Sequence, residues 1–168
     1  MARRVFFSFH HQADSWRVGQ VRNAWLTKGE TNQFLDAAEW EAVERAGDAT
    51  VKRWIDRQLK GTSVTVVLIG RETAQRKYVR YEIEQSLAKG NGLVGVFIHG
   101  IKDRAGRTSK EGPNPLDEFQ VANTNPLTSW LFPRCRASEI YSSHLWFDDN
   151  GRENLNDWIE EAARLAGR

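Results

Sequence analysis

The sequence predicts an open, mainly parallel α/β sheet covered by helices on both faces. Three short segments, residues 4–9, 64–69 and 93–98, are rich in β-branched and aromatic side chains, as strands are. They are almost continuously apolar rather than alternating, which indicates parallel strands buried on both faces. Segments with helical spacing lie between them, so we expect a doubly wound sheet with right-handed crossovers.

Four helices are expected from apolar residues that recur at helical spacing. They cover residues 15–28, 50–60, 77–89 and 155–165. A glycine follows closely after each of the first three, and we interpret Gly29, Gly61 and Gly90 as their C-terminal caps. Asp48 or Thr50 is expected to cap the start of the second helix.

Two further strands and one long excursion are predicted from weaker signals. Residues 34–36 are expected to form a short strand, and either residues 139–141 or 145–147 a final edge strand. Residues 102–133 contain all four prolines and several polar runs, which is typical of a surface excursion. We place this excursion within a single domain that spans residues 1–168.

Composition excludes several classes of protein. The formal net charge of +2, from 24 Lys and Arg against 22 Asp and Glu, is too small to indicate a nucleic-acid partner. With Cys135 as the single cysteine, neither an internal disulfide nor a zinc–thiolate cluster can form, and we expect no metal. The apolar run at residues 5–9 is too short for a signal peptide or a membrane span. We therefore expect a cytoplasmic protein with no membrane partner.

The ligand site of such a sheet is expected beyond the carboxyl ends of the strands, near the topological switch point. His10 and His11 follow the first strand and are suited to hydrogen bonding with a phosphate, a ribose or a base. An equally good interpretation is a loop pair that simply ends the strand. A histidine metal site is less favoured, because adjacent side chains on a strand end point in different directions.

Other loop residues at this edge are further candidates. Gly70 permits close backbone approach, and Arg71 offers a planar set of donors that suits phosphate. Asp36 is a candidate carboxylate for a ribose, and Trp40 a candidate stacking surface. Trp40 suits a core position equally well, and an exposed loop arginine is ordinary in any protein.

Glu82 is the most informative residue in the chain. In the helix at residues 77–89, Val79, Ile83 and Ser86 lie on the stripe that faces the sheet, and Glu82 lies at its edge. A carboxylate held there is costly unless it has a partner or a task. The alternative to a functional role is a structural ion pair or hydrogen bond, for example with Arg71 or a loop amide.

Common catalytic motifs are missing from the sequence. No Walker loop or G-x-G-x-x-G follows a strand, and neither G-x-S-x-G nor H-E-x-x-H occurs. A nucleotide-processing hydrolase on this architecture is disfavoured as well, since no carboxylate cluster for a metal is evident.

Several stretches together carry a resemblance to a known family. They are RVFFSFH, VRNAW, TSVTVVLIG, YVRYEI, KGN and GPNP, in this order between Arg3 and Pro115. The chain resembles the TIR-like family that includes ThsB of the Thoeris anti-phage systems. The resemblance implies a flavodoxin-like TIR fold and an enzyme that cleaves the nicotinamide–ribose bond of NAD, which is its substrate rather than a cofactor. It also implies that Glu82 is catalytic, with Tyr78 where the W-x-x-x-E motif of TIR enzymes has Trp.

The resemblance further implies a signalling role. ThsB proteins are thought to sense phage through a trigger that the sequence does not reveal, and to convert NAD into a cyclic ADP-ribose isomer. This diffusible nucleotide then activates a separate ThsA-like effector.

From their place in the loops alone, Phe9, His10 and Arg71 are expected to position the rings and phosphates of NAD. A non-catalytic TIR-like module that binds a nucleotide or a protein is the alternative, and self-association into homo-oligomers is left open.

Overall fold

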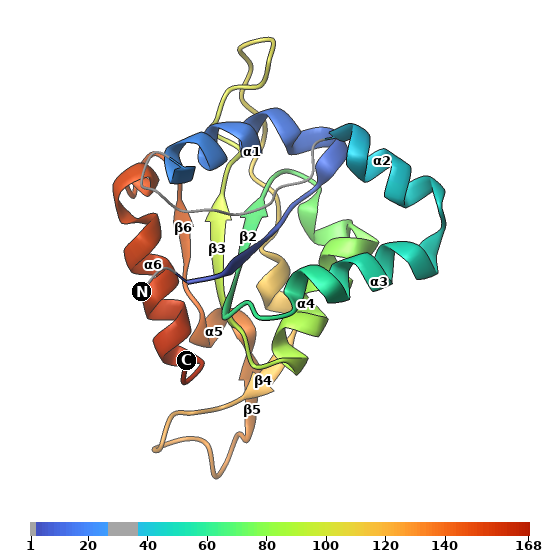
Figure 1. Cartoon of the computed structure of the whole chain (residues 1–168). Coiled ribbons are helices and arrows are strands. Elements are labelled where there is room, and N and C mark those ends of the chain that lie inside the picture. The colour runs from blue at the N-terminus through green and yellow to red at the C-terminus, as the bar shows by residue number, and fades with distance from the viewer. Residues whose placement is uncertain (1–2, 27–36) are drawn as a thin grey trace.

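A four-stranded parallel sheet forms the centre of the computed structural model, which describes residues 3–26 and 37–168. Its strands, in spatial order, are β1 (Val5–Ser8), β2 (Val64–Ile69), β3 (Gly92–Phe97) and β6 (Ser143–Leu145), as Figure 1 shows. Val5 pairs with Val64, Val66 with Val94 and Phe97 with Leu145. The predicted parallel α/β fold is confirmed, and the three apolar segments are its first three strands.

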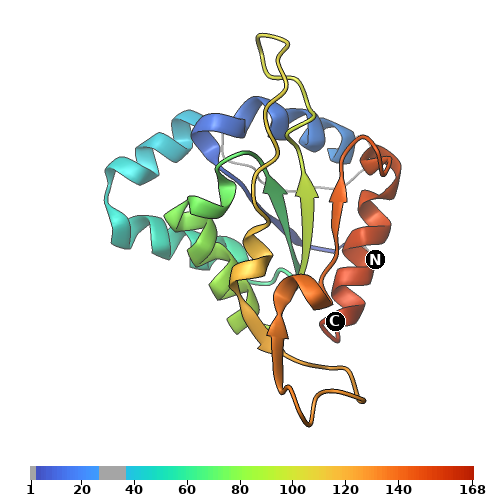
Figure 2. The ribbon, with the colours of Figure 1, turned by 180° about the vertical axis from the view of Figure 1, so that it is seen from behind.

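Helices cover both faces of the sheet. Side chains alternate between the two faces along each strand, and because apolar residues occur on both faces, both must be packed against helices. Val64, Val66 and Leu68 of β2 pack in a cluster with α1 (His11–Leu26) and α6 (Gly151–Leu165). Val67 and Ile69 pack on the other face with α4 (Lys77–Ala88), which Figure 2 shows from behind. All six residues of β2 are buried, which explains why its sequence is an apolar run.

Two helices pack around β1. In this third cluster, Phe6 contacts Trp40 of α2 (Ala37–Arg45) and Val51 and Ile55 of α3 (Asp48–Leu59). The sequence did not predict α2, and it placed the start of α1 at Ser15 rather than His11. Gly47 is the residue before α3, so neither Asp48 nor Thr50 caps that helix as expected.

The chain between β3 and β6 differs from its prediction. The segment at 102–133 contains a short 3-10 helix, η2 (Pro115–Glu118), and β4 (Gln120–Ala122), which pairs with β5 (Arg134–Arg136). Leu116 of η2 is fully buried in the cluster around α4, so the segment is not entirely a surface excursion. Phe119 and Val121 pack against the same cluster, and the prolines and polar residues around these apolar positions explain why the sequence did not indicate their burial.

The predicted edge strands need correction in the same region. Residues 139–141 are not a strand, because α5 (Ala137–Ile140) forms there and the Glu139 side chain accepts a hydrogen bond from the Arg136 N–H. Of the alternative at 145–147, only Leu145 lies in β6. The strand expected at 34–36 lies outside the described residues. Within the described parts of the chain, no helix has the length and apolarity needed to cross a membrane.

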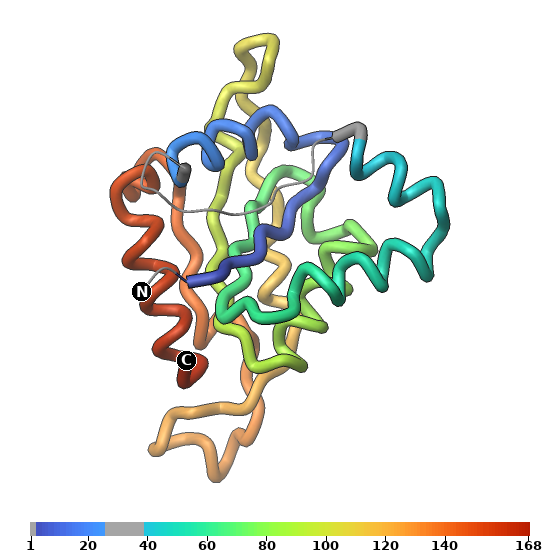
Figure 3. Tube along the Cα trace, viewed as in Figure 1, coloured from blue at the N-terminus to red at the C-terminus, as the bar shows by residue number. Residues whose placement is uncertain are grey.

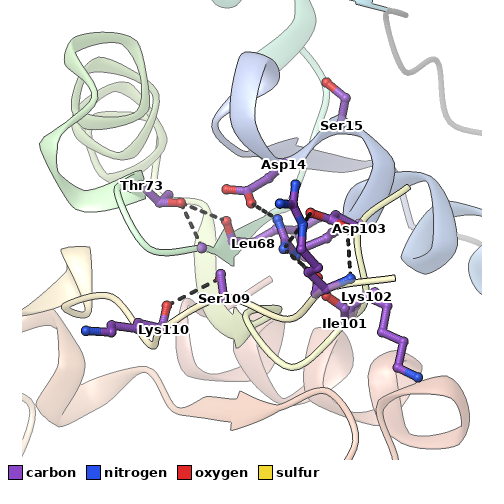
Figure 4. Close-up of polar contacts among 12 residues, drawn as sticks. Asp14, Ser15, Leu68, Thr73, Ile101, Lys102, Asp103, Ser109 and Lys110 are labelled. Atoms are coloured by element: carbon purple, nitrogen blue, oxygen red, sulfur yellow. Dashed lines mark hydrogen bonds and ion pairs between the residues drawn. The ribbon is translucent and has the colours of Figure 1, made fainter. Parts of the chain in front are cut away.

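Two segments extend beyond the sheet at opposite ends, as the path of the chain in Figure 3 shows. One leaves the carboxyl end of β3, and the Arg17 side chain of α1 holds its base by donating to the carbonyls of Ile101 (2.8 Å) and Arg107 (3.1 Å). Arg17 also pairs with the buried Asp14 at 3.3 Å; Figure 4 shows Asp14 together with Ile101 and Asp103. The other segment is the hairpin of β4 and β5.

Substitution of Gly92 tests the close contact between β3 and α6. A Cβ at this position would lie 2.1 Å from the Ala162 carbonyl oxygen, which is backbone and cannot rotate away. We expect Gly92→Ala to lower the free energy of unfolding by about 1–3 kcal/mol in urea denaturation. Gly19→Ala is the control, because a Cβ there meets nothing within 4 Å in α1 and should stabilise the helix by up to about 1 kcal/mol. Equal effects of the two changes would contradict this account.

Candidate functional site

A cavity of about 280 Å³ lies beyond the carboxyl end of β1, between the starts of α1 and α4 and the helix α2. The residues that line it are Phe9, His10, His11, Gln12, Trp40, Glu44, Arg76, Lys77, Tyr78, Val79 and Glu82. Six of these were candidates from the sequence: Phe9, His10, His11, Trp40, Tyr78 and Glu82. The structure therefore brings residues from three separate parts of the chain to one site, at the edge of the sheet where a ligand was expected.

Glu82 forms the inner wall of the cavity. Its neighbours Val79 and Ile83 pack α4 onto the sheet, which turns Glu82 inward as well. Only 1% of Glu82 is exposed, and its Oε2 accepts a hydrogen bond from the hydroxyl of Ser8, the last residue of β1. The side chain is thus more deeply buried than expected, and its partner is Ser8 rather than Arg71.

The environment of Glu82 favours the protonated carboxyl. Burial raises the pKa of Glu82 from its usual 4.5 to about 8, and the hydrogen bond from Ser8 opposes this shift only in part. The sequence interpretation required an ionised carboxylate, whereas the unliganded site holds a mostly neutral acid at pH 7. A cation beside Glu82 would favour ionisation, since opposite charges lower a carboxyl pKa.

Aromatic rings form the outer wall. The His11 ring lies between Phe9 and Trp40, with its centroid 4.0 Å from each, and it is stacked parallel to Trp40 within 4°. Trp40 also meets Tyr78 edge to face at 5.8 Å and packs against Trp54. Trp40 therefore anchors the core around β1, as one interpretation held, and also borders the cavity, while its role as a stacking surface for a ligand stays a prediction.

The two histidines are neutral groups in this wall. Burial lowers the pKa of His11 to about 3 and also lowers the pKa of His10, so neither ring is a cation at neutral pH. Among the described residues, the Nδ1 atoms of both rings have no hydrogen-bond partner. Buried polar atoms without a partner are uncommon in folded proteins, so these two nitrogens mark the wall as a candidate ligand contact.

Two cationic side chains line the cavity beside this wall. Arg76 pairs with Glu72 at 2.8 Å, and Lys77 pairs with Asp48 at 2.5 Å. Both pairs are solvent-accessible, and such pairs are weak enough to exchange for another anion. The site thus combines a deep carboxyl, neutral aromatic walls and nearby cations.

The comparison of the sequence with known families agrees with this geometry. The family described as "Thoeris protein ThsB, TIR-like domain" matches residues 6–103, which include every described residue of the cavity. The chain belongs to the Thoeris ThsB TIR-like family. A protein of Bacillus cereus (strain MSX-D12) named "Putative cyclic ADP-D-ribose synthase ThsB1" is 48% identical over 122 residues. The match covers 70% of this chain and 62% of that protein, so the chain spans less than two thirds of its relative's length.

Two other candidates, Gly70 and Arg71, do not line the cavity of this ThsB-type domain. Gly70 packs against Asp14, where a Cβ would lie 2.1 Å from the carboxylate, so the close approach that Gly70 permits is to a side chain of α1. Arg71 is exposed and does not line the cavity. Asp36 lies outside the described residues.

Sequence reasoning missed Ser8 and the cations of the cavity. Ser8 is a polar residue at the end of an apolar strand, and that position was the available signal. Arg76 and Lys77 are adjacent to Tyr78 at the start of α4, but nothing in the sequence distinguishes them from other surface cations. Among the described residues, no group of three or more His, Cys, Asp or Glu side chains is placed to hold a metal ion.

The raised pKa of Glu82 predicts a pH-dependent stability. The folded state binds this proton more tightly than the unfolded state, so the stabilisation is complete below pH 4.5 and is lost as pH rises through about 8. The free energy of unfolding should fall relative to that of Glu82→Gln, by up to about 1.4 kcal/mol per pH unit in this window. Urea denaturation of both proteins at several pH values measures the difference. A constant difference would show that the carboxyl titrates normally.

Proposed function

We propose that this chain binds NAD in the cavity and cleaves its nicotinamide–ribose bond. The observation that carries the proposal is the buried Glu82 carboxyl, held by Ser8 at the base of an aromatic-walled cavity. A titratable group in a cleft whose pKa is strongly shifted by burial is a candidate functional residue. The name of the Bacillus cereus relative, "Putative cyclic ADP-D-ribose synthase ThsB1", supports the same chemistry.

The size of the cavity indicates which part of NAD enters it. Its volume of about 280 Å³ is just below the range of roughly 300–1,000 Å³ that is typical for whole ligands. We therefore assign it to the nicotinamide ring and the ribose attached to it. The ring would lie against Trp40 and Tyr78, and Arg76 and Lys77 would be available to the pyrophosphate.

The proposed reaction breaks the bond between ribose C1′ and the nicotinamide nitrogen. Nicotinamide leaves as a neutral molecule with the bonding electron pair, and positive charge develops on the ribose. An ionised Glu82 beside C1′ stabilises this charge. Attack on C1′ by a nitrogen of the adenine base gives a cyclic product, whereas attack by water gives linear ADP-ribose; one proton is released in either case.

Glu82 is neutral in the unliganded site, whereas the proposed reaction requires it to be ionised, and substrate binding accounts for this change. The nicotinamide ring of NAD is a cation, and its entry beside the carboxyl favours the ionised form. Glu82 loses its proton as NAD binds, so the buried carboxyl is ionised only in the complex with substrate. Closure of the cavity by the rest of NAD would exclude water and favour the cyclic product.

The cyclic product would act as a signal. The relative's name supports a cyclic ADP-ribose, and membership of the Thoeris family supports a phage trigger and a ThsA-like effector that responds to the nucleotide. The partners of this chain are then NAD, the trigger and, through a diffusible product, the effector.

Replacement of the carboxyl tests the proposal. Glu82→Gln should reduce nicotinamide release from NAD by at least roughly a hundredfold, since it removes the charge that stabilises the transition state. The measurement is mass spectrometry of the products, with purified protein and with lysates of phage-infected cells that express it. Glu84→Gln is the matched control, because Glu84 is exposed on the same helix and should retain full turnover.

The alternative is a TIR-like module that binds a nucleotide or protein without catalysis. It predicts that Glu82→Gln changes the stability of the domain but leaves NAD and nicotinamide pools equal to those of the wild type during infection. If the purified wild-type protein is active, equal turnover of NAD by Glu82→Gln would likewise show that Glu82 takes no part in the reaction.

In this proposal the hydrogen bond from Ser8 lowers the pKa of Glu82, and the pH dependence of activity tests this role. In the free enzyme, kcat/KM should rise about tenfold per pH unit up to about pH 8, where Glu82 is ionised, and then level off. Ser8→Ala removes a hydrogen bond to a charged group, so the midpoint should move up by roughly one pH unit and activity at pH 7 should fall about tenfold. Ser86→Ala is the control, because Ser86 is equally buried on α4 but bonds the Glu82 backbone carbonyl. Equal profiles for both variants would exclude this role of Ser8.

A further inference from the structure

The tip of the β4–β5 hairpin exposes a cluster of large apolar side chains. Leu127, Trp130, Leu131 and Phe132 are 80%, 76%, 56% and 64% exposed. They account for four of the six large hydrophobic side chains that are exposed in the described parts of the chain. The hairpin extends away from the amino-terminal edge of the sheet, as Figures 1 and 2 both show. We call residues 123–133 the hairpin tip.

Internal hydrogen bonds shape this tip. The Asn123 amide donates to the Phe132 carbonyl at 2.8 Å, and the Asn125 side chain accepts from the Leu127 N–H at 2.9 Å. The Trp130 indole N–H donates to the Leu127 carbonyl at 3.1 Å. Polar groups of the loop are thus used to fold it, while the apolar side chains remain outside. A loop that is ordered before binding loses less entropy when it binds.

A hollow lies at the base of the same hairpin. It has a volume of about 460 Å³, and its mixed lining includes the apolar residues Leu87 of α4, Val121 of β4, Ile140 of α5 and Leu165 of α6 beside polar ones such as Asn91 and Gln120. Arg134 is the charged side chain among its lining residues. Its volume falls in the range of roughly 300–1,000 Å³ in which protein clefts take up bulky ligands. The hollow is therefore large enough to take up aromatic and leucine side chains of another molecule.

We propose that two copies of this chain pair through the hairpin, with the tip of each in the hollow of the other. The tip and the hollow lie along one hairpin, so two antiparallel hairpins related by a twofold axis satisfy both contacts at once. Residues 119–133 carry no charge, so nothing in the tip repels the rim of the partner's hollow. This reciprocity favours a second copy over an unrelated partner or a lipid surface.

The area available is sufficient for a dimer. The exposed parts of the four side chains amount to roughly 500 Å² per copy, given about 150–250 Å² for a whole aromatic side chain. Two tips and two hollows of similar area then bury roughly 2,000 Å², above the 1,000 Å² or so that a specific interface requires. The pairing uses the end of the sheet opposite to the Glu82 cavity, so it does not depend on the proposed reaction.

Oligomeric state in solution gives the first test. Sedimentation velocity of the full chain should show a dimer that dissociates on dilution. Trp130→Ser should raise the dissociation constant by roughly thirtyfold, as expected for the loss of a central aromatic contact. Trp16→Ser is the matched control, because Trp16 is a tryptophan of α1 with 54% exposure and should leave the dimer intact. A wild-type chain that is monomeric up to submillimolar concentration would overturn the proposal.

Cross-linking gives the second test and separates the outcomes. In a Cys135→Ser background, one population carries Ser129→Cys in the tip and another carries Ala166→Cys at the hollow. A short bis-maleimide should join the two populations into a mixed dimer. A dimer that forms without this cross-link would show that the tip of one copy does not lie in the hollow of the other. A third outcome is a chain that stays monomeric and binds lipid vesicles, with this binding lost in Trp130→Ser. That result would show that the tip contacts a membrane surface rather than a second copy.

Discussion

The hydrogen bond between Ser8 and Glu82 is the constraint on which the site depends. It joins the end of β1 to the middle of α4, two residues 74 positions apart in sequence, and both side chains are buried. A carboxylate in such a place is costly, and one hydroxyl does not repay the cost, so the acid is neutral at rest. Its depth is what makes its charge state sensitive to a cation in the cavity.

The cavity walls follow from the same packing that builds the core. Trp40 anchors α2 against Phe6 and α3, and the same ring stacks on His11 at the cavity. Loss of Trp40 would therefore loosen the core and open the site together. Trp40 is thus both a core residue and part of the cavity wall, which explains why its place in the sequence suited two interpretations.

The sequence predicted the parts of the structure whose signals are local. Strand β2 is a six-residue apolar run, and α4 has its apolar residues on one stripe; both were placed within a residue of their ends. It did not predict α2, whose Trp40 is held by tertiary contacts, or the pairing of β4 with β5. In the site, the position of Glu82 on its helix gave its inward direction. The Ser8 contact could not be foreseen, because it depends on how two distant elements meet.

The two ends of the sheet carry different chemistry. The carboxyl end holds a cavity lined by the buried Glu82 carboxyl and by His10 and His11, whose Nδ1 atoms are buried without a hydrogen-bond partner among the described residues. The amino-terminal end carries a loop whose polar atoms are satisfied within the loop and whose apolar side chains are exposed. The first arrangement gains free energy from hydrogen bonds to a ligand, and the second from removing apolar surface from water. Because the cavity and the hairpin lie at opposite ends of the sheet and the cavity shares no lining residue with the hollow, a substitution at one end leaves the side chains of the other in place.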